Sequence, residues 1–459
     1  MKKVVFLFIS LLTFIACTDS NDNVALIDDI AVFNDTTIIN LPEETPSLSI
    51  HEGLISQKAD TFRITRNGET IAIVRLGEPI MIAQAEERED WGYFQFPSLY
   101  QSDNGIIIAG WSMKEDAYTA YGEKTDGFRM SRDGGKTWEK LDRDYFMKAR
   151  SGVELENGDF LNYDTPISKD INDYPTFPEP VNQDPIAGYN FYFESELPLD
   201  LRGVYLEYWD RQSGKIINKH STLKDIELLR YTIDGFMPVV WWGEIKKEKE
   251  GSLIAGVYGG FYQNTEGDVL RTGISFYRSN DIGNSWSLVG KIPYQPDGKF
   301  YYFDGNDGFT EPTFEILNDG TYMCVMRTGS TTPMYRSFSK DEGLNWSIPE
   351  PFTPNGVKPN LLLLGNGTLI LSSGRPGLQI RFCIDGDGKI WTEPVEMMPF
   401  IDNEGRYDLY GLTCGYSSIL KKNDDTFYLV YSNFKIKNRN GEDRKAILFR
   451  KIEVIKKHS

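Results

Sequence analysis

Acid–base chemistry in this chain has to rest on carboxylates and tyrosine. The 459 residues include only three histidines, His51, His220 and His458, and no C-x-x-C spacing. A histidine-rich metal site and a Ser-His-Asp triad are therefore not expected, and the sequence predicts no metal and no other cofactor. Carboxylates and phenols are plentiful instead, with 67 acidic residues and 25 tyrosines.

Four residues that could do chemistry together stand at the ends of predicted strands. Glu311 precedes one apolar segment, and Arg327 ends the segment after it. Arg375 follows a later apolar segment, and Tyr416 opens the last strand region. The planar fork of an arginine can bind both oxygens of a carboxylate, and a glutamate can take the proton of a phenol. If the four side chains meet, they could bind an anionic substrate and act on it.

The pattern S-x-D-x-G-x-x-W recurs along the chain and predicts how these strands are connected. It occurs at residues 131–138, 279–286 and 339–346, with weaker copies at 383–391 and 209–215. The aspartate can accept hydrogen bonds from backbone N–H groups, the glycine can take a positive φ, and the tryptophan can bury its ring against the turn. We therefore interpret the aspartates of the pattern as structural rather than catalytic: Asp133, Asp281, Asp341 and Asp385.

The spacing of these segments predicts a propeller. Trp286, Trp346 and Trp391 follow one another at 60 and 45 residues, and propeller blades repeat at about 40–50 residues. The gap of 148 residues between Trp138 and Trp286 suits two blades. Short apolar segments that follow turn signals fill the intervals, and helical periodicity is weak beyond residue 20. The sequence therefore predicts an all-β fold of repeated four-stranded units.

The repeats resemble the Asp-boxes of the sialidase superfamily, across roughly residues 85–455. Members of that superfamily fold as six-bladed β-propellers. The resemblance thus implies an all-β, six-bladed propeller with Asp-box repeats over residues 85–459. Residues 18–84 are expected to form a polar tether and N-terminal strands. These strands either pack beneath the ring or pair with the last strand, residues 448–454.

The resemblance also implies roles for the four site candidates. Tyr416 matches the nucleophilic tyrosine of sialidases, and Glu311 matches the glutamate that activates it. Arg327 and Arg375 match arginines that bind the substrate carboxylate. A neutral phenol suits such a substrate because a carboxylate nucleophile would be repelled by it, and sialidases differ from most glycosidases in using a tyrosine.

Two positions depart from the sialidase pattern. The first arginine of the family stands in an F-R-I-P motif, whereas residues 94–97 read F-Q-F-P, which places Gln95 at the substrate. A neutral amide cannot form the charged, two-pronged contact of an arginine. The acid that protonates the leaving oxygen is expected in the loop after the first inner strands, where Asp116 is our choice and Asp126 the alternative.

The main functional hypothesis is an exo-acting glycoside hydrolase of sialidase type, which releases a terminal acidic sugar from glycans. One alternative keeps the fold without the chemistry, as a carbohydrate-binding propeller lipoprotein. Another is a hydrolase or lyase for a different, uronic-type sugar with a rebuilt site. A structural interpretation is also open, with Tyr416 as a buried aromatic residue and Glu311, Arg327 and Arg375 as an ion cluster around the propeller axis.

The first 17 residues are expected to be a lipoprotein signal peptide. Two lysines follow Met1, and the apolar run 4–16 is too short to span a membrane as a stable helix. Cys17 follows in an arrangement that resembles the lipobox of bacterial lipoproteins, and the acidic stretch after it resembles lipoprotein tethers of Bacteroides-like bacteria. We expect a lipid anchor at Cys17 and a place in the cell envelope, on the outer membrane facing the surface or the periplasm. A plain signal peptide is the alternative.

Charge and cysteine content limit the partners. The formal net charge is −18, and nucleic-acid binding needs a basic surface, so a nucleic-acid partner is not expected. Membrane contact is expected through the lipid anchor alone. Processing leaves Cys324, Cys383 and Cys414, an odd number that argues against a disulfide framework. The expected partner is a glycan or oligosaccharide substrate.

Overall fold

The computed structural model describes residues 58–101, 105–117, 127–140, 152–184, 188–239, 242–294, 308–399 and 409–457. The predicted lipidation site Cys17 and the alternative acid Asp126 lie outside these residues. Strands dominate the described chain, and its helices are short 3-10 turns: η3 (Ile171–Asp173), η4 (Glu194–Glu196) and η5 (Leu199–Leu201). The all-β prediction is confirmed.

Three sheets have four antiparallel strands each, arranged in sequence order. The first contains β4 (Gln95–Gln101), β5 (Ile107–Ser112), β6 (Gly127–Ser131) and β7 (Glu139–Lys140). The second contains β21 (Thr310–Ile316), β22 (Tyr322–Arg327), β23 (Met334–Ser339) and β24 (Glu350–Thr353). The third contains β25 (Val357–Leu363), β26 (Leu369–Gly374), β27 (Leu378–Cys383) and β28 (Val395–Met398). Each strand pairs with the next along the chain, because antiparallel neighbours can be joined by short turns.

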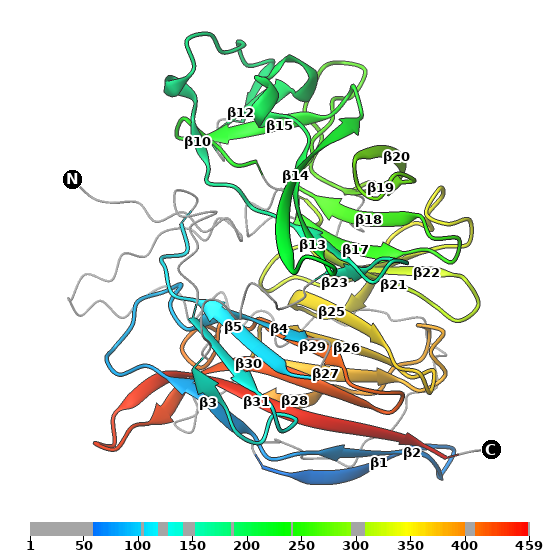
Figure 1. Ribbon diagram of the computed structural model, residues 1–459. Coiled ribbons are helices and arrows are strands. Elements are labelled where there is room, and N and C mark those ends of the chain that lie inside the picture. Colours follow the sequence, from blue (N-terminus) through cyan, green and yellow to red (C-terminus); the bar gives the residue numbers. More distant parts are fainter. Residues whose placement is uncertain are drawn as a thin grey trace, which may run out of the picture.

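The two ends of the described chain meet in a fourth sheet, at the bottom of Figure 1. Its order is β1-β2-β31-β30-β29, and β3 also pairs with β31. The strands are β1 (Asp60–Arg66), β2 (Glu69–Leu76), β3 (Ile80–Gln84), β29 (Ser417–Lys421), β30 (Thr426–Lys437) and β31 (Asp443–Lys456). β2 runs antiparallel to β31, with Val74 opposite Val454. The N-terminal strands therefore pair with the last strand, which is one of the two arrangements expected.

The fifth sheet joins two runs of strands through one parallel pair. The first run contains β17 (Trp242–Lys247), β18 (Leu253–Tyr258), β19 (Ile274–Ser279) and β20 (Ser285–Ile292). The second contains β14 (Lys215–Lys224), β13 (Val204–Asp210), β9 (Phe160–Tyr163) and β8 (Val153–Glu154). β14 meets β20 in parallel, with Leu223 opposite Trp286. The tryptophan of the repeat at 279–286 is fully buried at this seam.

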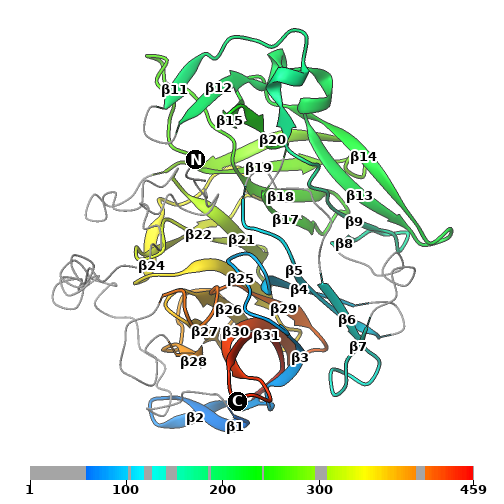
Figure 2. The same cartoon turned by 90° about the vertical axis from the view of Figure 1, so that its left-hand side faces the viewer.

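A sixth sheet is formed by segments that flank β13 and β14 in the sequence. Its order is β10-β16-β15-β12-β11. The strands are β10 (Lys169–Asp170), β11 (Asn182–Asp184), β12 (Tyr189–Phe193), β15 (Leu229–Ile233) and β16 (Phe236–Met237). Aromatic rings hold it together, with the rings of Tyr189 and Tyr231 4.8 Å apart and that of Phe261 5.7 Å from Tyr231. Figure 2 shows this sheet at the top of the molecule, at the opposite end from β1 and β2.

The repeated turns have the hydrogen bonds predicted from their pattern. In residues 279–286, Oδ1 of Asp281 accepts from the Ser279 hydroxyl (2.8 Å) and from the Ser285 N–H (2.9 Å). Gly283 has a φ of +75° and donates its N–H to Oγ of Ser279 (2.8 Å). The copies at 131–138 and 339–346 repeat these three bonds. The aspartates of these three copies are therefore occupied in turns.

The weaker copy at 383–391 differs from this scheme. Asp385, expected to hold the turn, pairs instead with Arg66 (2.5 Å). Asp387 takes over the turn and accepts from the Lys389 N–H (3.0 Å). The copy has one residue more before its tryptophan than the others, so the turn is displaced along the chain. Asp385 is still a structural residue, but through an ion pair.

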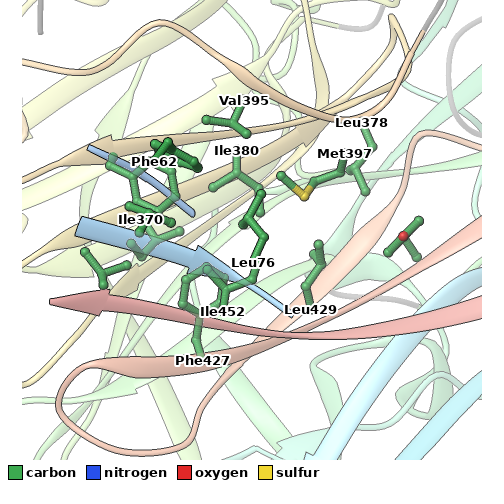
Figure 3. Packing of buried hydrophobic residues seen from close by; sticks show 14 of the residues in the cluster. Phe62, Leu76, Ile370, Leu378, Ile380, Val395, Met397, Phe427, Leu429 and Ile452 are labelled. Atoms are coloured by element: carbon green, nitrogen blue, oxygen red, sulfur yellow. The ribbon is translucent and has the colours of Figure 1, made fainter. Parts of the chain in front are cut away.

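The largest apolar cluster packs the β25–β28 sheet against the C-terminal sheet (Figure 3). β27 contributes Leu378 and Ile380, and β30 contributes Phe427 and Leu429. Phe62 from β1 packs edge-on against Phe382, with ring centroids 6.2 Å apart. Because Arg375 follows β26 and Tyr416 precedes β29, this core holds together the two sheets that carry them.

Replacing Ile380 by alanine tests how strongly this cluster joins the two sheets. Ile380 is 0% exposed, and a buried Ile→Ala change costs about 2–5 kcal/mol because it removes buried surface and leaves a cavity. Denaturant unfolding should show a loss of that size. The control Ile348→Ala, at a residue 80% exposed, should change the free energy of unfolding by less than about 0.5 kcal/mol. Equal effects of the two substitutions would contradict this account of the core.

Candidate active site

Neighbouring strand ends bring the candidate residues to one place. Edge strands of four sheets contact one another in the order β4, β29, β25, β21. Tyr416 lies directly before β29, and Glu311 is the second residue of β21. Arg327 ends β22, the partner of β21, and Arg375 follows β26, the partner of β25. Since an antiparallel strand begins where its partner ends, all four residues lie at the same edge of their sheets.

Three of these inner strands begin with the same β-bulge. In β4, β21 and β25 the pairing register breaks after the first residue. The residue that follows the first one is Phe96, Glu311 or Lys358, each with a left-handed φ between +44° and +51° and each before a proline. A bulge redirects a side chain relative to the regular pleat. The left-handed conformation is unfavourable for such residues, and strain of this kind is typical of functional sites.

Glu311 binds Tyr416 and Arg327 directly. The Tyr416 hydroxyl donates to Oε1 of Glu311. Nη1 of Arg327 lies 2.9 Å from the same oxygen and 3.4 Å from the Tyr416 hydroxyl oxygen. The other oxygen of Glu311, Oε2, accepts from the Lys358 N–H (2.7 Å). Tyr416 and Glu311 are each 6% exposed, so these bonds lie almost entirely out of water.

Arg375 joins this cluster and keeps one donor open. Its Nη1 donates to Oγ of Ser330 (3.2 Å), which also accepts from Nη2 of Arg327 (3.1 Å). Its Nε donates to the Cys414 carbonyl (3.3 Å). Nη2 of Arg375 is buried and has no hydrogen-bond partner among the described residues. A buried donor without an acceptor is unfavourable, and an oxygen of a bound anion would satisfy it.

Two glycines allow Arg375 and Tyr416 to approach each other. A Cβ atom on Gly374 would lie 1.7 Å from the carbonyl oxygen of Gly415. Gly415 has a φ of +78°, and a Cβ atom there would lie 2.8 Å from Cγ of Arg375. A side chain at either position would force the two segments apart. The glycine before each functional residue is therefore needed for the close approach.

Asp116 lies close to the cluster and is buried. Its Oδ2 accepts from the indole N–H of Trp91 (3.0 Å), and the Trp91 ring lies 5.9 Å from the guanidinium carbon of Arg375. Burial raises the pKa of Asp116, and the charge of Glu311 adds to this, against the Trp91 bond and the charges of Arg375 and Lys114. A carboxyl group with a raised pKa can hold the proton that a general acid delivers.

The pKa shifts of Glu311 and Tyr416 determine the resting protonation of the cluster. Burial acts to raise the pKa of Glu311, but Arg327, the Tyr416 hydroxyl and Lys358 outweigh it, and the pKa lies below its usual value. Burial and the charge of Glu311 hold the pKa of Tyr416 well above its usual value. At rest, Glu311 is therefore charged and Tyr416 is neutral.

Aromatic rings form a wall beside Tyr416 and Arg375. Phe96 packs edge-on against Tyr416, with ring centroids 5.1 Å apart. Tyr410 lies 4.9 Å from the guanidinium carbon of Arg375, close to Trp91, whose ring centroid is 5.8 Å from that of Tyr410. Phe96, Trp91 and Tyr410 are partly exposed. Apolar and aromatic walls around a few polar groups are typical of ligand sites.

Gln95, the predicted substrate-binding residue, does not join the cluster. Its side chain is buried, and its amide oxygen, oriented to satisfy its neighbours, accepts from the Gly92 N–H (3.1 Å) and from Nζ of Lys445 (3.2 Å). The bulge in β4 explains the difference, because the side chain that contacts Tyr416 belongs to Phe96, one position later. A motif read along the sequence does not reveal such a bulge.

Sequence reasoning misses the aromatic wall and three residues that form hydrogen bonds to the predicted ones. Ser330 links the two arginines, Trp91 binds Asp116, and the Lys358 N–H binds Glu311. Lys358 carries a signal that could have found it, since it precedes a proline as Glu311 does. Ser330 and Trp91 carry no such signal, because their roles depend on contacts between distant segments.

The described residues hold no group of three or more His, Cys, Asp or Glu side chains that could bind a metal ion. Cys324, Cys383 and Cys414 are buried free thiols. No helix in the described part of the chain is long and apolar enough to cross a membrane. The site is built from carboxylates, a tyrosine, arginines and a lysine.

No family model and no curated protein matches the sequence. Among solved structures, the chain is similar to a protein of unknown function from Dyadobacter fermentans, with a TM-score of 0.54 and 16% identity over 83% of this chain and 99% of the other. It is less similar to the NanB sialidase of Streptococcus pneumoniae, with a TM-score of 0.42 and 16% identity over 81% and 70% of the two chains. An alpha-L-arabinanase from Penicillium chrysogenum gives a TM-score of 0.46 and 18% identity over 81% and 98%. At 16% identity the first similarity shows a shared fold, so the function has to be argued from the site.

Proposed function

We propose that this protein is an exo-acting glycoside hydrolase that releases a terminal acidic sugar from a glycan, with Tyr416 as the nucleophile. The observation that carries the proposal is the direct hydrogen bond from the Tyr416 hydroxyl to Glu311, in a buried cluster with Arg327. A phenol needs an adjacent base to become a nucleophile, and Glu311 lies in that position. Arg375 offers a buried, open N–H group for a substrate carboxylate.

In the first step, the Tyr416 oxygen bonds to the anomeric carbon while the bond from this carbon to the glycosidic oxygen breaks. The phenol proton moves to Glu311, and the Asp116 proton moves to the leaving oxygen. In the second step, a water molecule attacks the anomeric carbon and gives its proton to Asp116. Tyr416 leaves and recovers its proton from Glu311. Two displacements retain the configuration of the anomeric carbon.

The opposite pKa shifts of Tyr416 and Glu311 restrict the timing of the first step. Since the pKa of the phenol is raised and that of the carboxylate is lowered, proton transfer before the attack is unfavourable. The proton therefore moves as the bond to the anomeric carbon forms. The charges of Arg327 and Arg375 act to lower the pKa of Tyr416, and they would stabilise negative charge on its oxygen in the transition state.

Sialic acid is one candidate for the acidic sugar, and a uronic acid is the second. Arg327 already donates hydrogen bonds to Glu311, to Ser330 and to the Gly329 carbonyl. Phe96, which contacts Tyr416, belongs to the F-Q-F-P stretch that matches the F-R-I-P motif of sialidases and has no arginine. Fewer free guanidinium groups and an aromatic wall favour the more compact of the two sugars, the uronic acid.

The proposal includes a six-bladed propeller. Four units of four strands, β4–β7, β17–β20, β21–β24 and β25–β28, would be four of the blades. The run β8-β9-β13-β14 would form a fifth, and β29-β30-β31-β2 a sixth, closed by the N-terminal strand. The sheet of β10, β11, β12, β15 and β16 would be an insertion. The contacts among β4, β29, β25 and β21 support such a ring of inner strands.

Tyr416→Phe should remove most of the hydrolytic activity. The substitution deletes the oxygen that bonds to the sugar and keeps the ring that packs on Phe96. We expect kcat/KM to fall by about 10³-fold or more, as for the loss of other catalytic nucleophiles. The measurement is a screen of umbelliferyl glycosides of sialic, glucuronic and galacturonic acid with wild type and variant.

Tyr322→Phe is the matched control, because the Tyr322 hydroxyl also donates to a buried glutamate, Glu248 (2.6 Å), outside the cluster. This variant should keep turnover close to that of wild type. Undiminished turnover in Tyr416→Phe would contradict the nucleophile assignment. A wild type that binds acidic sugars without any turnover would favour the alternative of a carbohydrate-binding protein.

Asp116→Asn should make the rate depend on the leaving group. For a sugar leaving group, which needs a proton, kcat/KM should fall by about 10²–10⁴-fold, whereas a 4-nitrophenyl glycoside should lose far less. The pKa of Glu311 is lowered from its ordinary 4.5, so the wild-type rate should rise with pH as Glu311 ionises below pH 4.5. The pKa of Asp116 is raised from its ordinary 3.8, so the rate should fall again at a pH above 3.8, as Asp116 loses its proton. The variant should lack the fall at higher pH. An unchanged pH profile with equal losses on both substrates would contradict the role of Asp116.

A further inference from the structure

Lys358 is a cationic residue of the site that the proposed mechanism leaves unused. It occupies the bulge of β25 in the same way as Glu311 occupies the bulge of β21, with φ values of +44° and +48°. Its N–H donates to Oε2 of Glu311 (2.7 Å), so its backbone touches the carboxylate at the centre of the cluster. The side chain is half-buried.

The ammonium group of Lys358 has no ion-pair partner in the described part of the chain, where Glu311 forms its ion pair with Arg327 (2.9 Å). Its charge nevertheless helps to lower the pKa of Glu311, which places it within electrostatic reach of the cluster. Lys246 in β17 provides a contrast, since its Nζ lies 3.2 Å from Glu315. A half-buried lysine beside a cluster of charges is normally paired in this way, whereas Lys358 has no such ion pair among the described residues.

We propose that Lys358 is a substrate-binding residue, which together with Arg375 holds the carboxylate of the acidic sugar. The order β4, β29, β25, β21 places the strand of Lys358 and the strand of Phe96 on opposite sides of β29, which Tyr416 precedes. The sugar would thus meet a positive group on one side of Tyr416 and an aromatic ring on the other. This inference takes the identity of the ligand, an acidic sugar, from the proposed function. It does not require that the protein hydrolyses that sugar.

The backbone supports a role for the side chain. A left-handed φ is unfavourable for lysine, and glycine would adopt it without strain. The bulge itself therefore does not call for a lysine. An ammonium group on a flexible stem can reach one oxygen of a carboxylate while Nη2 of Arg375 reaches the other.

Calorimetric binding of free sugars, measured in the Tyr416→Phe background, tests this inference without turnover. The probes are sialic, glucuronic and galacturonic acid, with glucose as the neutral control. Lys358→Met should weaken the tightest acid on the order of tenfold and leave glucose unchanged, because only the charge is lost. Lys358→Arg should restore most of the affinity. Lys389→Met, at a lysine whose side chain is 74% exposed, is the control and should have no effect.

Lys358→Gly serves as a second variant, because it relieves the backbone strain and removes the charge. It should fold at least as well as wild type, by thermal melting, and bind the acids as weakly as Lys358→Met. The inference would be overturned if the Lys358 variants bound the acids as tightly as the protein with Lys358. It would also be overturned if the acids bound no better than glucose. Charge-dependent binding in a protein without turnover would keep the role of Lys358 and reject the hydrolase proposal, so the two failures are distinguishable.

Discussion

The buried hydrogen bond between Tyr416 and Glu311 is the contact on which the rest of the site depends. A carboxylate out of water is stable only when donors surround it, and Glu311 has the Tyr416 hydroxyl, Arg327 and the Lys358 N–H. Removing one partner of a buried ion pair such as Arg327 and Glu311 costs about 3–5 kcal/mol. The cluster therefore contributes to the structure whatever its chemistry.

The structural and functional interpretations of this cluster differ in how many buried donors and charges they leave without a partner. In an ion cluster that serves the fold alone, the large majority of buried donors have partners. Here Nη2 of Arg375 is buried without a partner among the described residues, and the ammonium group of Lys358 forms no ion pair with any of them. Both groups suit an anion that none of the described residues supplies. The surplus of positive groups favours a ligand site.

The same β-bulge, with a left-handed residue before a proline, occurs in three strands and carries three kinds of side chain. The bulge before a proline presents Phe96 from β4, Glu311 from β21 and Lys358 from β25. Repeated sheets thus place an apolar, an acidic and a basic residue at the ends of strands that lie close together. The repeated backbone conformation is the same, and the side chain at the repeated position differs from sheet to sheet.

Local patterns predicted the fold better than the site. The turns around Asp133, Asp281 and Asp341 follow from their own few residues, so their hydrogen bonds could be predicted. Asp385 is structural as predicted, but it leaves its turn because a single extra residue displaces that turn. In β4 the bulge brings Phe96 rather than Gln95 into contact with Tyr416. Both differences arise from register, which a sequence pattern does not contain.

Residues of the site that act through distant partners were harder to predict. Tyr416 and Glu311 are 105 positions apart, and they were paired through a family resemblance rather than through their local sequence. The contact of Trp91 with Asp116 had no local signal. The sequence left two arrangements open for the N-terminal strands. Local patterns do not decide between them, because the pairing of β2 with β31 joins opposite ends of the chain.

The most direct test of the central claim is to trap the covalent intermediate. The reagent is a glycosyl fluoride of the acidic sugar that the protein hydrolyses fastest, with a second fluorine on the carbon next to the anomeric carbon to slow the second step. Intact mass should rise by one sugar, and peptide mapping should locate that sugar on Tyr416. A sugar attached to Glu311 or Asp116, or continued turnover of the reagent with no adduct at any residue, would contradict the account.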